Sequence, residues 1–419
     1  MQQLIEKLNA NTPEERLSAL AELLKVEKEK PVKRDNDANN HIHTIYSFSP
    51  YSPTKAAYMA YKAGLTSAGI MDHDSLSGAV EFKKACEIIG LGSTCGVEVR
   101  VKFDRGFGKI NHPDQPDCIY MAAHGIPQEN INAFNEYLSV FRAKRNERNK
   151  KMCQSITKKF SAFNIELDFE RDVMPLSECK NGGSITERHL LYALAVKLSE
   201  RFTDRNALIA FLENDLKLGV SEKIKGFLLD LENPHFLYDL LGVLKADTAF
   251  FYIDADEEMP VAEDFIKKAK EFGAIPAYAY LGDVGNSVTG DKKAQKFEDD
   301  FLPQLIEEIK KAGIQAVAYM PTRNTVEQLE RLMKMCKENN LFEISGEDIN
   351  SPRQKFECAA LANPRYSHLI DSTWALIGHE EAMNKGSVKD GMFAEKVENA
   401  LSLQARIKKY AEIGRKTIN

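Results

Sequence analysis

The chain has 419 residues, of which 43% are hydrophobic and 28% are charged, and its formal net charge is -6. These values are typical of a soluble globular protein, and the acidic balance argues against a nucleic-acid polymer as partner, because such partners select basic surfaces. The seven cysteines are scattered and form no CxxC pair, which favours a reducing compartment. No secretory-type leader and no run of eighteen apolar residues is present, so we expect a cytoplasmic protein without a membrane partner.

The first segment of the chain predicts a helical arm. Residues 12–15 read Thr-Pro-Glu-Glu, a capping box with proline at the first helical position, and leucines then recur at helical spacing. The charged, asparagine-rich stretch at 27–40 is typical of a linker. We therefore predict an N-terminal helical arm over residues 1–37, packed on the outside of a main domain over residues 38–419.

Three short segments carry residues that bind metals. His41 and His43 are two apart, so in an extended segment both imidazoles project from the same side. An apolar segment leads into Asp72-His73-Asp74, and a third segment ends at Glu98, a carboxylate able to bridge two ions. Strand ends that deliver histidine and carboxylate to one point indicate a hydrolytic metal centre. The two histidines alone would be weak evidence, because a surface strand with two solvated histidines is the more common case.

Strand and helix signals alternate around these segments. Ser52-Pro53 begins a helix that stops at Gly64, a strand runs to Met71, and Ser77 begins a helix that ends near Gly90. This alternation is typical of parallel sheets and barrels, in which functional residues lie at the carboxyl ends of strands. A barrel with insertions reaches the length of this chain without dividing into two domains.

The alternation is interrupted at about residues 134–246, where long charged helices predict an inserted helical subdomain, with helices at 141–160, 190–202 and 205–218. Beyond it we predict strands at 249–253, 274–280, 316–320 and 341–344. Amphipathic helices are predicted at 261–272 and 301–312, and one closing helix at 393–410.

Six motifs in this order resemble those of the PHP (polymerase and histidinol phosphatase) domain family of metal-dependent phosphoesterases. They are His41-Ile42-His43-Thr44, Asp72-His73-Asp74, Gly96-Val97-Glu98, Met121-Ala122-Ala123-His124, Phe272-Gly273-Ala274-Ile275-Pro276 and Ser345-Gly346-Glu347-Asp348. The resemblance covers about residues 38–130 and 270–352. It implies an α/β fold, a distorted (β/α)7 PHP-like barrel, here with a helical insertion and an N-terminal helical arm.

The resemblance also implies a set of metal ligands. The residues in its metal-binding positions are His41, His43, Glu98, His124 and Asp348. The first site keeps all four family ligands, whereas in the second site Tyr280 replaces a histidine, and a phenol is a poor ligand near neutral pH. In the third site Phe48 and Asn350 replace ligands and only His73 remains. We therefore expect one or two divalent ions, which by ligand type are zinc, manganese or iron, and no third ion.

His73, Asp72 and His189 are predicted to be catalytic, and Arg145, Arg148 and Arg188 are predicted to bind the substrate. His73 either binds metal or orients a ligand, and Asp72 is expected to fix a neighbouring imidazole. Arg188 and His189 resemble an arginine and histidine that phosphoesterases of the family place over the site, and Arg145 and Arg148 resemble their preceding helix. Cations there would hold a phosphate, although two arginines three apart also fit a solvated helix face.

Two further side chains, Tyr280 and Asn350, are predicted to contact the substrate, since an amide can hydrogen-bond a phosphate oxygen. His379 follows an apolar run and is expected to be buried and structural. The leading hypothesis is a hydrolase of small phosphate esters that uses metal-activated water. The alternatives are a degenerate PHP domain that keeps one structural metal and acts as a binding or regulatory module, and hydrolysis of a non-phosphate bond. The sequence does not indicate an oligomeric state.

Overall fold

The computed structural model describes residues 1–28, 30–32, 34–112, 114–285 and 296–418. The strands are β1 (Arg34–Ile42), β2 (Leu65–His73), β3 (Gly92–Lys102), β4 (Cys118–His124), β5 (Ile275–Tyr280), β6 (Ala316–Tyr319) and β7 (Phe342–Ser345). The helices are α1 (Gln2–Lys7), α2 (Pro13–Val26), α3 (Pro53–Lys62), α4 (Ala79–Ile89), α5 (Ile131–Phe160), α6 (Glu187–Arg201), α7 (Arg205–Ala210), α8 (Glu222–Leu229), α9 (Phe236–Leu244), α10 (Ala262–Glu271), α11 (Leu302–Ala312), α12 (Val326–Glu338), α13 (His368–Lys385), α14 (Glu395–Glu398) and α15 (Leu403–Arg415).

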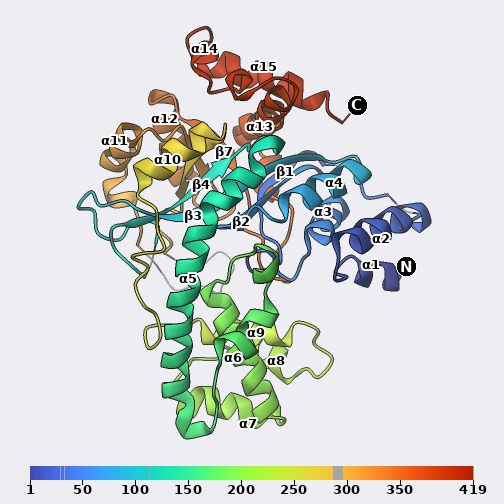
Figure 1. Ribbon diagram of the computed structural model, residues 1–419, viewed down its shortest axis with the longest axis vertical. Coiled ribbons are helices and arrows are strands. Elements are labelled where there is room, and N and C mark those ends of the chain that lie inside the picture. Colours follow the sequence, from blue (N-terminus) through green and yellow to red (C-terminus); the bar gives the residue numbers. More distant parts are fainter. Residues whose placement is uncertain (29, 33, 113, 286–295, 419) are drawn as a thin grey trace.

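The seven strands form one sheet in sequence order, β1 to β7. All neighbours are parallel except β4, which runs antiparallel to both β3 and β5. The sheet curls back on itself, because the His43 amide donates to the Ile349 carbonyl (2.9 Å) and the Ile349 amide donates to the His41 carbonyl (3.1 Å). The predicted α/β barrel of seven strands is confirmed, with one strand reversed and closure made beyond the end of β7 (Figure 1).

Helices cover the barrel on several sides. In Figure 1, α3 and α4 lie beside the first strands, α10 to α12 lie on the opposite side, and α13 and α15 cap one end. Helices α13 and α15 pack closely at Gly378, where an added Cβ would lie 1.8 Å from the Tyr410 carbonyl oxygen. The prediction of one closing helix at 393–410 is wrong, because two helices, α14 and α15, occupy this region. The Ser402 hydroxyl accepts a hydrogen bond from the Ala405 amide and so starts α15 as a separate helix.

The helical insertion extends from the barrel on α5, which continues unbroken from the barrel flank into the insertion (Figure 1). Helices α6 to α9 build a second apolar core around it. The strand predicted at 249–253 is wrong, since these residues form turns and irregular backbone. Its apolar run has another cause: Phe251 is buried in the core of the insertion. Helix α7 is also shorter than expected, because a π-helical turn follows it at Phe211–Asp215.

The N-terminal arm is built as predicted in its helical part, and Thr12 closes the expected capping box on α2. Its attachment is a buried ion pair of Arg16 with Glu81, at 2.6 Å. The linker expected at 27–40 is wrong in its second half, because β1 begins at Arg34. The predicted boundary at residue 37 therefore falls within the first strand of the barrel.

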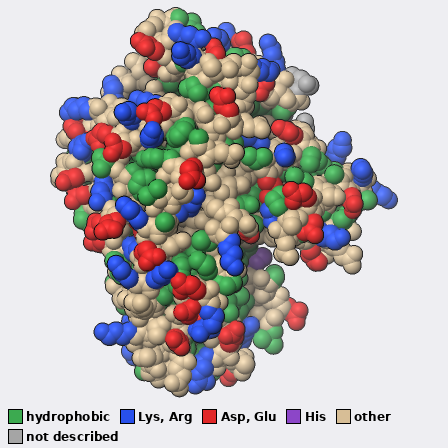
Figure 2. Space-filling model, viewed as in Figure 1, with side chains coloured by type: hydrophobic (Ala, Val, Ile, Leu, Met, Phe, Trp, Pro, Cys, Tyr) green, Lys and Arg blue, Asp and Glu red, His purple; other side chains and the backbone are tan. Residues whose placement is uncertain are grey.

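The surface carries charges of both signs. Figure 2 shows lysine and arginine side chains interspersed with aspartate and glutamate over the face that it views. Within the described residues, no helix is long and apolar enough to cross a membrane.

Candidate metal centre

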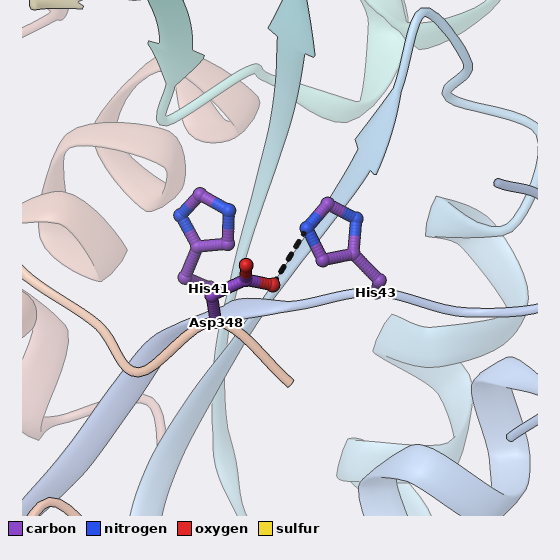
Figure 3. A group of neighbouring side chains, drawn as sticks. All are labelled: His41, His43 and Asp348. Carbon is purple, nitrogen blue, oxygen red and sulfur yellow. Dashed lines mark ion pairs between the residues drawn. The ribbon is translucent and has the colours of Figure 1, made fainter. Parts of the chain in front are cut away.

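The two histidines of the first motif lie at the end of β1. Ile42 between them is fully buried, so the alternation of an extended chain turns both imidazoles to the opposite side. Their ring centroids are 5.0 Å apart. Asp348, from the segment after β7, reaches the same point, and its Oδ1 lies 3.2 Å from His43 Nε2 (Figure 3). Barrel closure thus joins ligands from the two ends of the sheet.

Glu98 approaches these groups from β3. Its Oε2 lies 3.7 Å from His41 Nε2 and 3.9 Å from His43 Nε2. It also lies 3.1 Å from Nδ1 of His73, which ends β2 and pairs with Glu98 in the sheet. Metal–ligand bonds of about 2.0–2.2 Å bring ligand atoms to similar separations. The chain therefore holds two overlapping candidate ligand groups, one of His41, His43 and Asp348 and one of His43, His73 and Glu98.

The charges of this cluster favour a cation. Burial alone would raise the pKa of Glu98, but His41, His73 and His43 around it lower that pKa to about 2. Burial would likewise lower the pKa of His41, yet Glu98 and the nearby carboxylates raise it. Without a metal, the raised pKa of His41 favours a proton on its ring, which compensates part of the carboxylate charge. A divalent ion would displace this proton, so metal affinity should fall as pH falls.

A hydrogen-bond relay fixes the tautomer of His43. The Ser47 hydroxyl donates to Asp72 Oδ1 at 2.6 Å, so it can accept from His43 Nδ1–H, which lies at 3.3 Å. The Nε2 lone pair of His43 then faces Glu98 and Asp348. Asp72 is 1% exposed and also accepts from the Thr44 amide and hydroxyl, both at 2.6 Å. This geometry fits the predicted function of Asp72, which is to orient a neighbouring imidazole. The Asp72 carboxylate oxygens are already occupied by hydroxyl and amide donors.

A pocket of about 70 Å³ adjoins His41 and Glu98 and extends to His124. Nε2 of His124 is buried and has no hydrogen-bond partner among the described residues, and burial lowers the pKa of this histidine to about 3. Two more polar atoms of pocket-lining residues, Asn40 Oδ1 and Ser345 Oγ, are buried and lack partners in the described chain. Unsatisfied buried polar atoms beside a cavity of this size fit a bound ion with water.

Tyr280 lines the same pocket, but its hydroxyl donates to Asp299 at 2.6 Å. Burial and this carboxylate raise its pKa, so the phenol stays neutral. His124 and Glu98 are thus the side chains here that fit a second ion, with water completing its shell.

The position that the resemblance assigns to a third metal ion is filled by side chains. Phe48 is 7% exposed and packs edge-on against the His189 ring, with centroids 4.9 Å apart. The Asn350 amide donates to Asp348 and therefore supports a first-site ligand. His73 faces Glu98, so its geometry fits direct ligation beside the first site. Burial, only partly offset by Glu98, lowers the pKa of His73 well below its usual value and leaves the ring neutral.

The three arginines and the histidine that the prediction places over the site differ sharply in their surroundings. Arg145 pairs with Asp74 and Glu258, and Arg148 pairs with Glu258 and Glu187. These two arginines are therefore buried ion-pair partners, and we no longer assign them to substrate binding.

Arg188 is different, because its guanidinium has no hydrogen bond or ion pair within the described part of the chain. Its charge nevertheless acts on the metal centre, since it is among the groups that lower the pKa of Asp348 and of His73. At the next position, His189 Nδ1 accepts the Thr186 amide at 3.0 Å, which leaves its proton on Nε2. Burial lowers the pKa of His189 to about 3, so this ring is a neutral donor.

Sequence reasoning did not identify Ser47, Arg100 or Glu258. Arg100 could have been found, because it stands two positions after Glu98 on one strand and so projects to the same side. Ser47 is a loop residue, and Glu258 lies in irregular chain after the insertion. Neither position carries a periodic signal.

Comparison with known families gives one match: residues 39–188 match the PHP domain. No curated protein matches the chain. Among solved structures, a candidate metal-dependent phosphoesterase from Bifidobacterium adolescentis superposes with a TM-score of 0.50 at 19% identity, covering 80% of this chain and 96% of that one. An amidohydrolase from Chromobacterium violaceum, solved with sulfate and no metal, gives a TM-score of 0.50 at 17% identity with the same coverage. At these identities the two structures support the fold.

Proposed function

Because this chain carries a PHP domain, we propose that it is a metal-dependent hydrolase of small phosphate esters. One observation carries the proposal: the Arg188 guanidinium, which has no partner among the described residues, acts on a cluster of histidines and carboxylates that favours cations. A phosphate group fits both the guanidinium and the cation-binding cluster, since its oxygens bind divalent ions and accept charge-assisted hydrogen bonds from arginine. The acidic net charge of -6 and the small pocket favour a small molecule over a polymer.

The site residues would have two functions, to bind metal ions and to bind the phosphoryl group. His41, His43, Glu98 and Asp348 would hold a first divalent ion, with His73 beside it, and Glu98 with His124 a second. Such an ion supplies Lewis acidity, which activates water at neutral pH and polarises the phosphoryl group. Arg188 would donate hydrogen bonds to the phosphoryl oxygens and neutralise charge that builds on them. His189 can add one neutral donor through Nε2–H.

A second candidate function is a binding or regulatory module that keeps one metal and has lost catalysis. Two observations favour it: the Tyr280 hydroxyl is bonded to Asp299, and the Phe48 ring is buried at the third site. Three of the first-site ligands, His41, His43 and Asp348, nevertheless have ligand atoms within 4.8 Å of one another, and His124 Nε2 has no partner among the described residues. We therefore place the hydrolase first.

The test is elemental analysis of the untagged protein together with hydrolysis of a panel of aryl phosphate monoesters and diesters. We expect at least one bound transition metal, and turnover that a chelator abolishes and added divalent ion restores. Metal and phosphate binding without turnover on any ester would instead establish the binding module. Protein that carries no metal and binds none would refute both functions.

The proposed binding of phosphate by Arg188 is tested by Arg188→Ala. Hydrogen bonds to charged groups contribute roughly 1.5–3 kcal/mol each, so inhibition by inorganic phosphate should weaken by about 10- to 100-fold. Arg201→Ala, at the exposed end of the same helix, is the matched control and should leave inhibition unchanged. Unaltered phosphate inhibition in Arg188→Ala would remove the cation from the proposed site.

A further inference from the structure

A network of six charged side chains lies between the insertion and the barrel. The members of this buried ion network are Asp74, Arg100, Arg145, Arg148, Glu187 and Glu258. All are buried except Glu187, whose side chain is 24% exposed. The network contains three arginines and three carboxylates, so its formal charges cancel. Buried charges are stable only when they are paired and hydrogen-bonded in this way.

Glu258 is the centre of the network, because all three arginines donate to its carboxylate. Nε of Arg148 lies 2.6 Å from Oε2, Nε of Arg145 lies 3.1 Å from Oε1, and Arg100 donates to the same Oε1. Burial alone would raise the pKa of Glu258, but these guanidinium groups lower it and keep the carboxylate ionised.

The segment that carries Glu258 is anchored to the barrel. The Lys102 amide at the end of β3 donates to the Pro260 carbonyl at 2.9 Å, and Lys102 forms a parallel bridge with Val261. The two arginines of α5 are thereby held against the strand that carries Glu98.

The outer members of the network adjoin residues of the candidate site. Glu187, which accepts from Arg148 and, at 3.1 Å, from Arg100, immediately precedes Arg188. Asp74, which accepts from Arg145, immediately follows His73. Its backbone is left-handed, with φ of 51°, and its amide donates to the Glu98 carbonyl at 2.9 Å. The network therefore fixes the start of α6 relative to β2 and β3.

We infer that Glu258 is a positioning residue for phosphate binding: by pairing Arg100, Arg145 and Arg148, it holds Glu187 and hence Arg188 against the metal centre. The inference rests on the proposed function for its phosphate. Without the Glu258 charge, three guanidinium groups would share two carboxylates. Arg148 would lose its Nε partner, and Glu187 would move to compensate the excess positive charge. Arg188, one residue away, would move with it.

The test uses Glu258→Gln, which keeps the shape and one acceptor but removes the charge, in metal-loaded protein. Direct calorimetry of inorganic phosphate should show affinity about tenfold weaker than wild type, with metal content unchanged. In the Arg188→Ala background the same substitution should change phosphate affinity by less than about twofold, because its effect passes through Arg188. Amide hydrogen exchange at residues 187–191 should be faster in Glu258→Gln.

Two further variants separate this function from simple stability. Glu81→Gln removes an equally buried arginine partner far from α6, and it should lower the thermal midpoint without altering phosphate affinity or exchange at residues 187–191. Glu258→Asp keeps the charge and should recover most of the affinity even if Glu258→Gln folds poorly. Wild-type affinity in Glu258→Gln, or an undiminished effect in the Arg188→Ala background, would overturn the inference. If wild-type protein binds no phosphate, the proposed function fails, and unchanged exchange at residues 187–191 would separately overturn the positioning.

Discussion

The molecule contains two clusters of buried charge, and they differ in what their charges are paired with. In the buried ion network every arginine meets a carboxylate of the chain, and positive and negative charges are equal in number. In the metal centre the nitrogen and oxygen atoms of His41, His43, His73, Glu98 and Asp348 crowd toward common points. The nearby Nε2 of His124 has no partner in the described chain.

The difference separates scaffold from ligand site. A charge that is satisfied inside the protein fixes geometry, whereas a buried polar atom that is left unsatisfied requires a partner from solution. By this criterion Arg145 and Arg148 belong to the scaffold, whereas the partly exposed Arg188, which has no partner within the described chain, remains a proposed residue of the site. Two buried histidines show the same contrast, since both ring nitrogens of His379 are hydrogen-bonded while one nitrogen of His124 is not.

The largest expected effect is at Glu98, which lies within 4 Å of three imidazoles. Glu98→Gln should lower metal content and reduce hydrolysis to background, because the amide lacks the charge that the ions need. The measurements are elemental analysis and kcat/KM. His235→Gln, in the insertion, is the control and should change neither. Equal metal content in wild type and Glu98→Gln would refute the assignment of the metal centre.

A smaller effect is expected at Ser47, which contacts no proposed ion and acts through His43. Ser47→Ala removes the acceptor of His43 Nδ1–H, so the imidazole can change tautomer or rotate. Loss of such an outer partner typically weakens metal affinity by about 10- to 100-fold, and we expect the lower end because Asp72 keeps its bonds to Thr44. Metal-buffered titration measures it. The control Ser49→Ala should match wild type, because the Ser49 hydroxyl accepts a long bond of 3.4 Å from the Tyr51 amide.

The smallest effect concerns the pH dependence of stability at His379, on the scaffold side of the comparison. Its ring accepts the Met392 amide and donates to the Gly273 carbonyl, both at 2.8 Å, and burial lowers its pKa to about 4. The unfolded chain, with a histidine pKa of about 6.5, binds a proton between these values while the folded protein does not. Stability therefore falls as pH drops from about 6.5 to about 4, and this residue should contribute on the order of 1–2 kcal/mol to the loss by pH 5.

Denaturant unfolding at pH 7.5 and pH 5 measures this contribution, with His379→Gln as the comparison. The variant should be less stable at pH 7.5 but should lose less on acidification, and its metal content should equal that of wild type. An identical acid loss in both proteins would show that His379 is not responsible.

Sequence patterns were most informative where a short local segment fixes the geometry. The alternation of His41 and His43, the capping box at Thr12 and the strand end at His73 all concern residues a few positions apart, and the structure has them as predicted. The strand end predicted at Glu98 is wrong, because β3 pairs with β4 as far as Lys102 and Glu98 lies inside it. The helical insertion was also predicted from the change in periodicity.

The errors arose where the deciding partner is distant in sequence. Spacing along α5 cannot tell whether Arg148 meets a phosphate or a carboxylate, and its partner Glu258 lies 110 residues further on. Similarly, the apolar run around Phe251 fits a strand equally well, and only the presence of a second core in the insertion explains it as irregular chain. Tertiary burial, not local propensity, decided both cases.

Closure of the barrel has a consequence for the newly made protein. The Asn40 side chain bonds to the Ser345 carbonyl, 305 residues further along the chain. The candidate ligands His41 and Asp348, which follow these two residues, are about as far apart in sequence. Chains emerge from the ribosome from the N-terminal end, so the two histidines are made long before Asp348. The candidate ligand set is therefore complete only after Asp348 has been made, and selection among competing ions by the full set can begin only then.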